Sequence, residues 1–353
     1  MSGSYPMLRP GVTYFIEHSP NQSLVHVGTE ESSTTLNGHT AIMLIPKCDG
    51  NLDLDEITEQ LQITQSELLM MLQPLVVSGL LVLLQRPFLK NNHENLSARN
   101  SIARAQAELN LIIWRGRNDP QTALFKRSEK KILITDSSNL SLAIYSLLLA
   151  SGFTNVKIEI ESDKRVEANQ INGQPFSTRD IGAPLKSALR EKQREIALNL
   201  DIYRPETSDF LQEGAVPDLV LSSQNLKLER TQRLMAEGIA HLQISNFVAG
   251  KIEVGPLVIP GKTPCLNCIE LWKSSENDLN KISLMAKLDY ALPTPVATTS
   301  FISGLVVGLM DNFFAENQSF LIGSSLLLDL NRPLNYLERF WQPHPRCGCL
   351  ELL

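Results

Sequence analysis

The chain contains 353 residues, of which 43% are hydrophobic and 20% are charged, as in an ordinary globular protein. At roughly 100–200 residues per domain, this length predicts two domains. The net charge of -6 gives no reason to expect non-specific binding to nucleic acid, which needs an excess of positive charge.

Targeting signals are not evident in the sequence. No apolar run approaches the roughly 18 residues that a membrane span needs, and the opening MSGSYPMLRPGV lacks the basic and apolar regions of a signal peptide. We therefore expect a cytoplasmic protein without a membrane partner. Disulfides rarely persist in that compartment, so the five cysteines are expected to be thiols or metal ligands.

Residues 1–86 form the first predicted domain, in which short strands are followed by helices. The last helix begins with Thr64 and Glu67 in the spacing of a capping box, and Gly79 follows its end. Pro74 lies inside this helix and is expected to kink or shorten it. Strands followed by three helices are typical of a winged helix-turn-helix. The predicted elements are strands Val12–Ile16, Leu24–Gly28 and Ser33–Asn37 and helices His39–Pro46, Leu54–Leu61 and Thr64–Ser78.

Residues 87–129 are more polar and are predicted to be a linker with a connecting helix. The run KNNHENLSARN indicates the linker, and Ser101–Asn110 has the pattern of an amphipathic helix. The following LIIW is expected to be a short apolar strand or contact segment.

Residues 130–353 form the second predicted domain, in which strands alternate with helices. Its opening is a β-α-β unit made of strand Ile132–Thr135, helix Leu140–Ala150 and strand Val156–Ile160. This alternation predicts an α/β domain with a mostly parallel sheet and helices on both faces. The later predicted elements are helix Pro184–Ala197, strand Leu219–Ser222, helix Leu228–Glu237, strands Leu242–Phe247 and Gly255–Ile259, helix Ser300–Phe313 and strand Phe320–Leu328.

The turn after strand Ile132–Thr135 has the outline of a nucleotide-binding turn without its glycines. Such a turn places glycines at the first, third and sixth positions after the strand, so that the backbone can approach phosphate. Asp136, Ser138 and Ser141 stand at those positions here. The turn by itself fits either a coincidental α/β segment or a nucleotide fold that has lost its nucleotide.

Four of the five cysteines form two close pairs, Cys265 with Cys268 and Cys347 with Cys349. Two such pairs suit tetrahedral zinc, and four coordinating thiolates leave no position for water, so the predicted site is structural. The alternatives are a redox pair or buried free cysteines. His344 is the one candidate for a substitute ligand.

The segments after the polar turn resemble the ThiF-like, ubiquitin-activating-enzyme-like adenylating proteins. In order, VKIEIESDKRVEANQINGQPFSTRDIGAPLKSALREKQREIALNLDI resembles that family's strand, D-x-D-x-V, S-N-L-N-R-Q, D-I-G-x-P-K and helix. PDLVLSSQNLKLER then resembles its D-x-V-x-D-x-x-D-N segment, and both cysteine pairs lie where the family carries zinc. The resemblance covers about residues 130–349 and implies a Rossmann-like domain.

Most of the family's ATP-handling residues are replaced in this chain, so the resemblance implies a degenerate nucleotide site. An adenylating enzyme neutralises a triphosphate with arginine, lysine and magnesium together. The family's lysine position holds a leucine, although Lys186 is adjacent. We therefore do not expect ATP as a cofactor. The family's acidic pair, arginine, lysine and magnesium-binding aspartate fall on Glu161, Asp163, Gly173, Leu185 and Gln224.

A narrower resemblance covers both ends of the chain. The motifs G-P-L-V-x-P-G-x-T-x-C-L-x-C at Gly255–Cys268 and H-P-x-C-G-C at His344–Cys349 look like those of the ThiF-like partner proteins of azoline-forming cyclodehydratases. Near the N-terminus, LRPGV and CDGNLDLDEITEQL resemble that family's peptide-recognition domain. The resemblance implies a leader-peptide-binding subunit in the biosynthesis of a bacteriocin-like peptide. This subunit presents a ribosomal precursor peptide to a YcaO-type cyclodehydratase.

A leader peptide without a fold of its own can add as a strand to an exposed sheet edge, with apolar side chains entering a groove beside the last helix. Any one of the groove residues could equally be part of the domain core. The expected edge residues are Thr34, Thr35 and Leu36, and the expected groove residues are Leu68, Met71, Leu72 and Leu75.

Two other functions remain open from the sequence. One is an enzyme with the same layout that adenylates or crosslinks a precursor peptide with ATP. The other is a DNA-binding regulator, but the third helix, TQSELLMMLQPLVVSG, has no Lys or Arg to meet phosphates or guanine edges. The resemblance also allows a homodimer, because ThiF-like proteins commonly pair through this domain.

Overall fold

The computed structural model describes residues 3–19, 22–88, 96–171, 175–200, 216–245, 247–248, 250–276, 294–316, 319–331 and 335–349. Contacts between residues divide the chain into two compact units. The first runs to Lys126, and the second begins at Arg127, apart from a short segment from Asn199 that groups with the first. Each unit is described by itself below.

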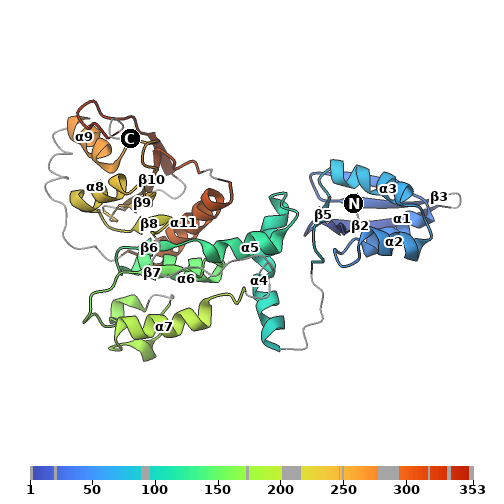
Figure 1. Ribbon diagram of the computed structural model, residues 1–353, viewed down its shortest axis with the longest axis horizontal. Coiled ribbons are helices and arrows are strands. Elements are labelled where there is room, and N and C mark those ends of the chain that lie inside the picture. The colour runs from blue at the N-terminus through green and yellow to red at the C-terminus, as the bar shows by residue number, and fades with distance from the viewer. Residues whose placement is uncertain are drawn as a thin grey trace. The chain divides into compact units, whose positions relative to one another are not determined.

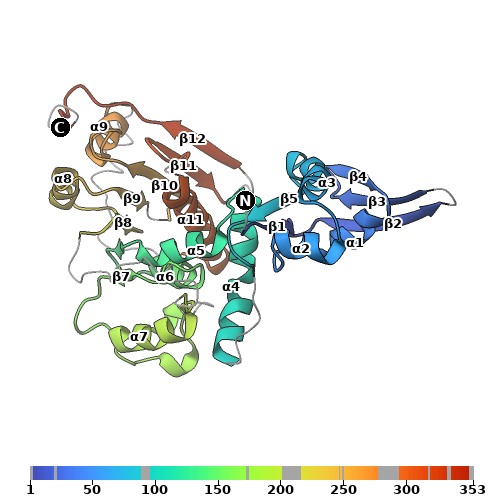
Figure 2. The ribbon, with the colours of Figure 1, turned by 45° about the vertical axis from the view of Figure 1, so that its right-hand side comes forward.

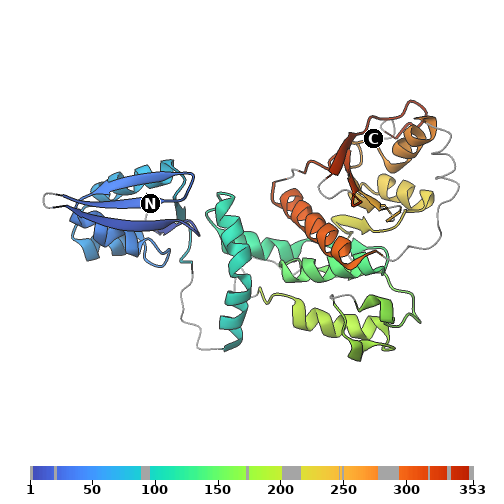
Figure 3. The same cartoon turned by 180° about the vertical axis from the view of Figure 1, so that it is seen from behind.

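The first unit has a three-stranded antiparallel sheet, in which β3 lies between β2 and β4. In Figure 3 these strands lie in front of the helices, so the unit has two layers. The three strands and three helices expected from the sequence are confirmed, while a two-stranded sheet of β1 and β5 was missed. The elements are β1 Tyr5–Leu8, β2 Thr13–Ser19, β3 Gln22–Gly28, β4 Ser33–Asn37, α1 His39–Leu44, α2 Leu54–Leu61, α3 Gln65–Val77 and β5 Leu81–Leu84.

Helix α3 begins and ends as the sequence indicates. The Thr64 hydroxyl accepts from the Glu67 N–H while the Glu67 carboxylate accepts from the Thr64 N–H, which is the predicted capping box. The helix is not shortened at Pro74 but continues to Val77. The Ser78 hydroxyl donates to the Pro74 carbonyl oxygen at 2.8 Å and so satisfies an oxygen of the last turn.

Residues 87–129, expected to be a linker with a connecting helix, contain two helices, α4 Leu96–Trp114 and α5 Pro120–Glu129. The expected helix Ser101–Asn110 lies within α4. The predicted strand LIIW is wrong, because α4 continues through it. A run of four apolar residues can belong to a packed helix as readily as to a strand, because its length alone does not distinguish the two. The Trp114 indole N–H then donates to the Pro10 carbonyl oxygen at 2.8 Å.

The second unit is built on a seven-stranded mixed sheet in the order β12-β11-β10-β9-β8-β6-β7. β7, β6, β8 and β9 are parallel to one another, but β9, β10, β11 and β12 pair antiparallel. The α/β class is confirmed, whereas the expectation of a mostly parallel sheet is wrong. The elements are β6 Ile132–Ile134, α6 Asn139–Ala150, β7 Val156–Ile158, α7 Leu185–Ile196, β8 Leu219–Ser222, α8 Leu228–Ala236, β9 His241–Ile244, β10 Lys251–Val258, α9 Leu266–Glu276, α11 Val296–Glu316, β11 Ser324–Asp329 and β12 Asn335–Phe340.

Helices cover both faces of this sheet (Figure 1 and Figure 2). Ile132 and Ile134 of β6 belong to the large core that contains α6 and α11. The alternate residue, Leu133, packs with Val220 and with Leu234 of α8. Successive side chains of a strand point to opposite faces, so a continuous apolar strand needs a helical layer on each side.

Helix α11 is a core helix of this unit. By length and composition its 21 residues could cross a membrane, with a mean hydropathy of 1.3 over the most apolar window, so the expectation that no such run exists is wrong. Its Ile302, Val306 and Met310 are buried in the same core as α6. A long apolar helix is what a large buried core also requires.

Arg127 and Asp311 form a buried ion pair that connects the start of the second unit to α11. The Arg127 guanidinium donates to both Asp311 carboxylate oxygens, with Nε to Oδ1 at 2.8 Å and Nη2 to Oδ2 at 2.9 Å. Its Nη1 also donates to the Ser151 carbonyl oxygen at 2.7 Å. Arg127 and Asp311 are only 5% and 7% exposed, so each charge depends on its partner for compensation.

We predict that Asp311→Leu will lower the free energy of unfolding by about 3–5 kcal/mol, because the buried Arg127 guanidinium then loses the carboxylate that it contacts with two N–H groups. The double variant Arg127→Met with Asp311→Leu will lose much less, since no unpaired charge remains. Urea denaturation of the wild type and the two variants measures these values. A double variant as unstable as the single one would contradict this explanation.

Candidate functional site

The two cysteine pairs come together although 78 residues separate Cys268 from Cys347 in the sequence numbering. Cys265 and Cys268 lie at the start of α9, and Cys347 and Cys349 follow β12. Their four sulfurs all lie within 4.8 Å of one another. The shortest separations are 3.4 Å from Cys268 to Cys349 and 3.5 Å from Cys265 to Cys347.

This geometry fits a tetrahedral metal ion. A Zn–S distance of about 2.3 Å places the sulfurs of a regular tetrahedron about 3.8 Å apart, within the observed range of separations. Four thiolates are a donor set that zinc prefers. His344 is not one of the four clustered ligands, and its Nδ1 accepts from the Arg346 N–H at 3.1 Å. The residues present therefore fit the expected ion, which would fix the end of the chain against α9.

Burial favours the protonated form of two of the cysteines, Cys265 and Cys268, when no cation is present. It raises the pKa of the Cys268 thiol to about 11 and also raises the pKa of Cys265. A metal ion must therefore displace protons to bind the thiolates. Metal affinity should consequently depend steeply on pH.

The tail that carries Cys347 is held by other contacts as well. The Trp341 indole donates to the Ser325 hydroxyl at 2.9 Å, and the Trp272 indole of α9 donates to the Gln342 carbonyl oxygen at 2.8 Å. Trp272 also meets the His344 ring edge to face, with 4.7 Å between centroids. These contacts place the second cysteine pair beside the first.

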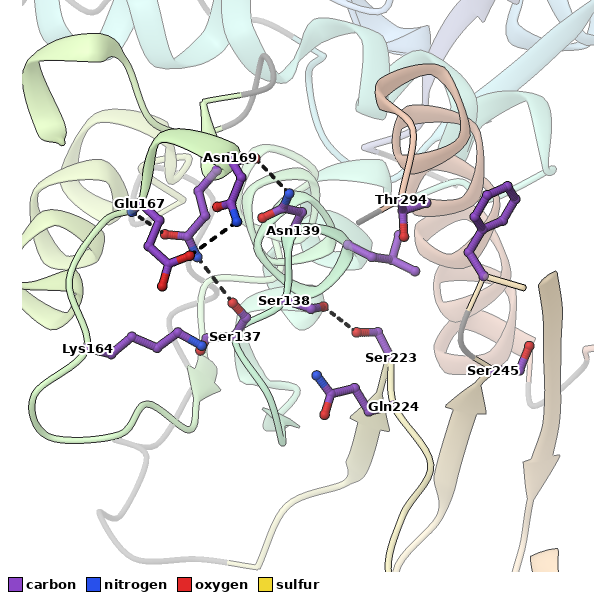
Figure 4. A pocket seen from close by; sticks show the side chains of 13 residues that line it. Ser137, Ser138, Asn139, Lys164, Glu167, Asn169, Ser223, Gln224, Ser245 and Thr294 are labelled. Carbon is purple, nitrogen blue, oxygen red and sulfur yellow. Dashed lines mark hydrogen bonds between the residues drawn. The ribbon is translucent and has the colours of Figure 1, made fainter. Parts of the chain in front are cut away.

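A second candidate site is a polar pocket of about 210 Å³ at the carboxyl ends of β6 and β8 (Figure 4). Ligands of open α/β sheets commonly bind at the carboxyl ends of two adjacent strands whose following connections run to opposite sides of the sheet. β6 and β8 are such a pair, because β6 is followed in the chain by β7 on one of its sides and β8 lies on the other. Lys164 is the one cation of the lining, and within the described part of the chain no carboxylate lies in ion-pair distance of it. The lining residues are Ser137, Ser138, Asn139, Leu140, Lys164, Glu167, Asn169, Gln170, Ser223, Gln224, Ser245, Phe247 and Thr294.

The Asp136 carboxylate accepts hydrogen bonds from the turn after β6 and from the residue after β8, below this pocket. Its Oδ1 accepts from the Ser138 N–H at 3.0 Å and from the Ser223 hydroxyl at 2.9 Å, and its Oδ2 accepts from the Ser223 N–H at 2.9 Å. Ser138 caps α6 through the Ser141 N–H. A carboxylate of the chain therefore occupies two backbone donors, one at the start of α6 and one just after β8, where a glycine turn would leave room for phosphate.

The residues expected at a degenerate nucleotide site are only partly brought together. Ser138 and Gln224 line the pocket, and Asp136 and Ser141 lie in the hydrogen-bond network beneath it. The acidic pair Glu161 and Asp163 is exposed and does not line the pocket. The remaining position of the family's phosphate site, Gly173, lies outside the described residues.

The position of the family's lysine, and the lysine next to it in this chain, do not line the pocket either. Leu185 is buried in the core, and Lys186 is exposed at the start of α7 without lining the pocket. The acidic and basic residues of the lining, Glu167 and Lys164, come instead from the segment between β7 and α7. Sequence reasoning missed these residues because only the fold returns that segment to the end of β6.

The expected peptide-binding residues divide into two groups. Thr34, Thr35 and Leu36 lie on β4, an edge strand of the three-stranded sheet, as expected. Leu68, Leu72 and Leu75 are at most 1% exposed and belong to the core, so they cannot line an open groove. Met71 is partly buried and is the one expected residue of α3 that remains accessible.

Comparisons with known proteins find similarity in fold. No family model matches the chain, and no curated protein matches its sequence. The solved structure of E. coli MccB with AMPCPP and MccA is 14% identical with a TM-score of 0.61, and covers 99% of each chain. The microcin C7 biosynthetic enzyme MccB with N-formylated MccA is 15% identical, with a TM-score of 0.60, over 98% of this chain and 99% of that one.

A third similar structure is the heterocyclase TruD, which is 13% identical with a TM-score of 0.56. The match covers 98% of this chain but 43% of TruD. At these identities the likeness shows a shared fold. It extends over both units of the chain.

We predict that zinc affinity will fall steeply as the pH is lowered from 8 to 6. Each thiol that must lose a proton contributes about a tenfold change in affinity per pH unit, so Cys265 and Cys268 together give about 100-fold per unit. The affinity is measured by competition with a chelator of known affinity at each pH, followed by mass spectrometry of the intact protein.

Cys347→Ser is the matched test of the ligand set. It should reduce the bound zinc and lower the thermal midpoint, whereas Cys48→Ser, at a buried cysteine outside the cluster, should leave the metal content unchanged. Metal content that is the same in wild type and Cys347→Ser would overturn the assignment.

Proposed function

We propose that this chain is a leader-peptide-binding scaffold subunit that recruits a ribosomal precursor peptide and presents it to a YcaO-type cyclodehydratase for azoline formation. The observation that carries the proposal is the free edge of β4 beside accessible apolar residues of α3. Residues 1–86, within the first unit, would then be a winged helix-turn-helix recognition domain. Residues 130–353, which include most of the second unit, would be a ThiF-like domain that acts as the scaffold.

The edge of β4 offers backbone groups to an added strand. The Gly38 N–H donates to the Ser23 carbonyl oxygen, and the Thr29 N–H donates to the Ser32 carbonyl oxygen. Both bonds join residues that continue the pairing of the β3–β4 register, so the even-numbered residues of β4 are the ones that hydrogen-bond to β3. In an antiparallel ladder the alternate residues turn their N–H and C=O groups away from the partner strand. Ser33 and Thr35 therefore present these groups to the free edge, where a peptide strand can bind them.

Helix α3 supports this edge with an apolar face. The Thr34 hydroxyl donates to the Ser78 hydroxyl at 3.2 Å, so the side of α3 that carries Ser78 lies against β4. At about 100° per residue, Met71 and Pro74 lie within about 40° of Ser78 around the helix axis. The core leucines lie on one side of these residues and the solvent on the other.

The solvent side of α3 continues the apolar face beyond the edge. Met70 and Val77 are 71% and 79% exposed, and with Pro74 they form a stripe at the i, i+4 and i+7 spacing of one helix face. Exposed apolar residues in a continuous stripe mark binding surfaces more often than isolated ones do. We therefore assign Met71, Pro74, Met70 and Val77 to the groove in place of the three buried leucines.

The same helix argues against a nucleic-acid partner. Residues Gln65–Val77 include no Lys or Arg that could contact phosphates. An apolar stripe suits a peptide with apolar side chains instead. The flexible methionines suit side chains of varied shape.

The second unit serves in this proposal as a structural partner without a catalytic residue. A structural zinc ion held by Cys265, Cys268, Cys347 and Cys349 would stabilise it, and the protein would act in the cytoplasm beside the cyclodehydratase. The Asp136 carboxylate at the start of α6 supports this role, because it repels a triphosphate from the place that a glycine turn would leave open.

We predict that Thr35→Pro will weaken leader binding at least about tenfold, because the proline ring removes one edge N–H and adds bulk there. The N–H lost is not part of the β3–β4 ladder, so the sheet should persist. Fluorescence polarisation of the full chain with the labelled leader segment of its precursor peptide measures the affinity without ATP.

Two control variants distinguish loss of binding at the β4 edge from a general loss of folded protein. Thr35→Ala keeps the N–H and should bind almost as wild type, although it loses the hydroxyl contact with His26. His18→Pro alters the opposite edge, on β2, and should also bind normally. Equal affinity of Thr35→Pro and Thr35→Ala would contradict binding at this edge.

A second candidate function is an ATP-dependent enzyme that adenylates or crosslinks a precursor peptide. The polar pocket with Lys164 favours it, together with the fold shared with MccB, whose structures include complexes with AMPCPP and ATP. Pyrophosphate release that depends on both ATP and the precursor decides between the two functions.

We expect the wild type to release no pyrophosphate above background, and Lys164→Ala to give the same result as the wild type. The assay uses the full chain with ATP, magnesium and the same precursor. Release that requires the precursor and falls in Lys164→Ala would replace the scaffold proposal with the enzymatic one.

A further inference from the structure

The cysteine centre holds an excess of negative charge that the surrounding chain must compensate. Four thiolates around one divalent cation carry a net charge of about -2. Two of these cysteines, Cys265 and Cys268, are buried, and so water compensates their charge poorly. N–H groups that donate to the sulfurs are the compensation that a protein can supply at such a depth.

Donors to the sulfurs come from both segments that form the centre. The Asn267 amide Nδ2, at the start of α9, donates to the Cys347 sulfur at 3.3 Å. In the opposite direction, the His344 backbone N–H in the tail donates to the Cys268 sulfur at 3.3 Å. Each segment therefore donates to a sulfur of the other segment.

Of these two donors, the Asn267 amide belongs to a side chain and can be removed by substitution, whereas the His344 N–H belongs to the backbone. It stands between Cys265 and Cys268, and it is not a metal ligand of the cluster. Its amide has no charge of its own, so its effect on the centre passes through the N–H···S bond to Cys347. Leucine has nearly the same shape as asparagine without the donor, and aspartate has the same shape with a negative acceptor.

We propose that Asn267 is a positioning residue of the metal centre, which compensates thiolate charge through Cys347 and thereby determines how long the ion is retained. This inference rests on the proposed four-cysteine centre and names a residue outside the ligand set. The N–H donated to Cys347 compensates part of the negative charge that the thiolates bring into the centre, so the loaded centre is more stable with this donor than without it. It also holds the tail cysteine against α9.

The test measures metal release and metal spectroscopy in the intact protein. Wild type, Asn267→Leu and Asn267→Asp are loaded with zinc, and the rate of release to a chromogenic chelator in excess is measured at pH 7.5. Loss of a partner of this kind typically costs 10–100-fold in metal affinity, so we expect release about 10-fold faster from Asn267→Leu. Release from Asn267→Asp should be faster still, because a carboxylate repels the thiolates.

Cobalt-substituted protein supplies the readout that a merely structural role would not change. In Asn267→Leu the sulfur-to-cobalt charge-transfer band should move to lower energy, because a sulfur without its N–H donor gives up electron density more readily. Asn225→Leu is the control, since Asn225 is exposed and its amide oxygen accepts from Gln243 away from the cysteines. It should match the wild type in both measurements.

The outcomes separate this inference from the proposed centre. If wild type binds neither zinc nor cobalt, the metal assignment itself is wrong. If wild type binds both but Asn267→Leu has the same release rate and the same band energy, the role of Asn267 is wrong while the centre remains. Faster release with an unchanged band would reduce Asn267 to a packing residue and would also overturn the inference.

Discussion

The second unit depends on the burial of its central parallel strands from both sides. β6 and β8 carry apolar side chains on alternate faces, and so two layers of helices have to cover them. The long apolar helix α11 supplies one layer with α6, and α8 supplies part of the other. The buried pair of Arg127 and Asp311 fixes the register between the entry to β6 and α11, because neither charge tolerates separation from its partner.

The order of the strands in this sheet determines which side chains lie at each candidate site. The carboxyl ends of β6 and β8 lie together, so Ser138 and Ser223 meet at the floor of the polar pocket. Asp136 occupies the backbone donors there, and the pocket retains amides, hydroxyls and the single cation Lys164. The cysteine cluster lies elsewhere, at the start of α9, where the chain end after β12 reaches it.

The first unit offers a different kind of surface, built from a strand edge and a helix face. The edge of β4 exposes backbone groups, and the neighbouring face of α3 exposes apolar side chains without a cation. Backbone pairing gives affinity for any extended peptide, whereas the apolar stripe selects among side chains. The proposed peptide recognition rests on these two features of the first unit.

The sequence by itself determined the α/β class, most helices of both units, the capping box at Thr64 and the four clustered cysteines, because local periodicity, capping residues and ligand spacing are short-range signals. Only the tertiary structure decided that Leu68, Leu72 and Leu75 are core while Met70 and Val77 are exposed, since helical periodicity gives a face without saying what covers it. It also decided that LIIW extends α4, that half of the sheet is antiparallel, and that Lys164 and Asn267 lie at the two sites. Each of these outcomes depends on contacts between segments distant in the chain, which no local pattern specifies.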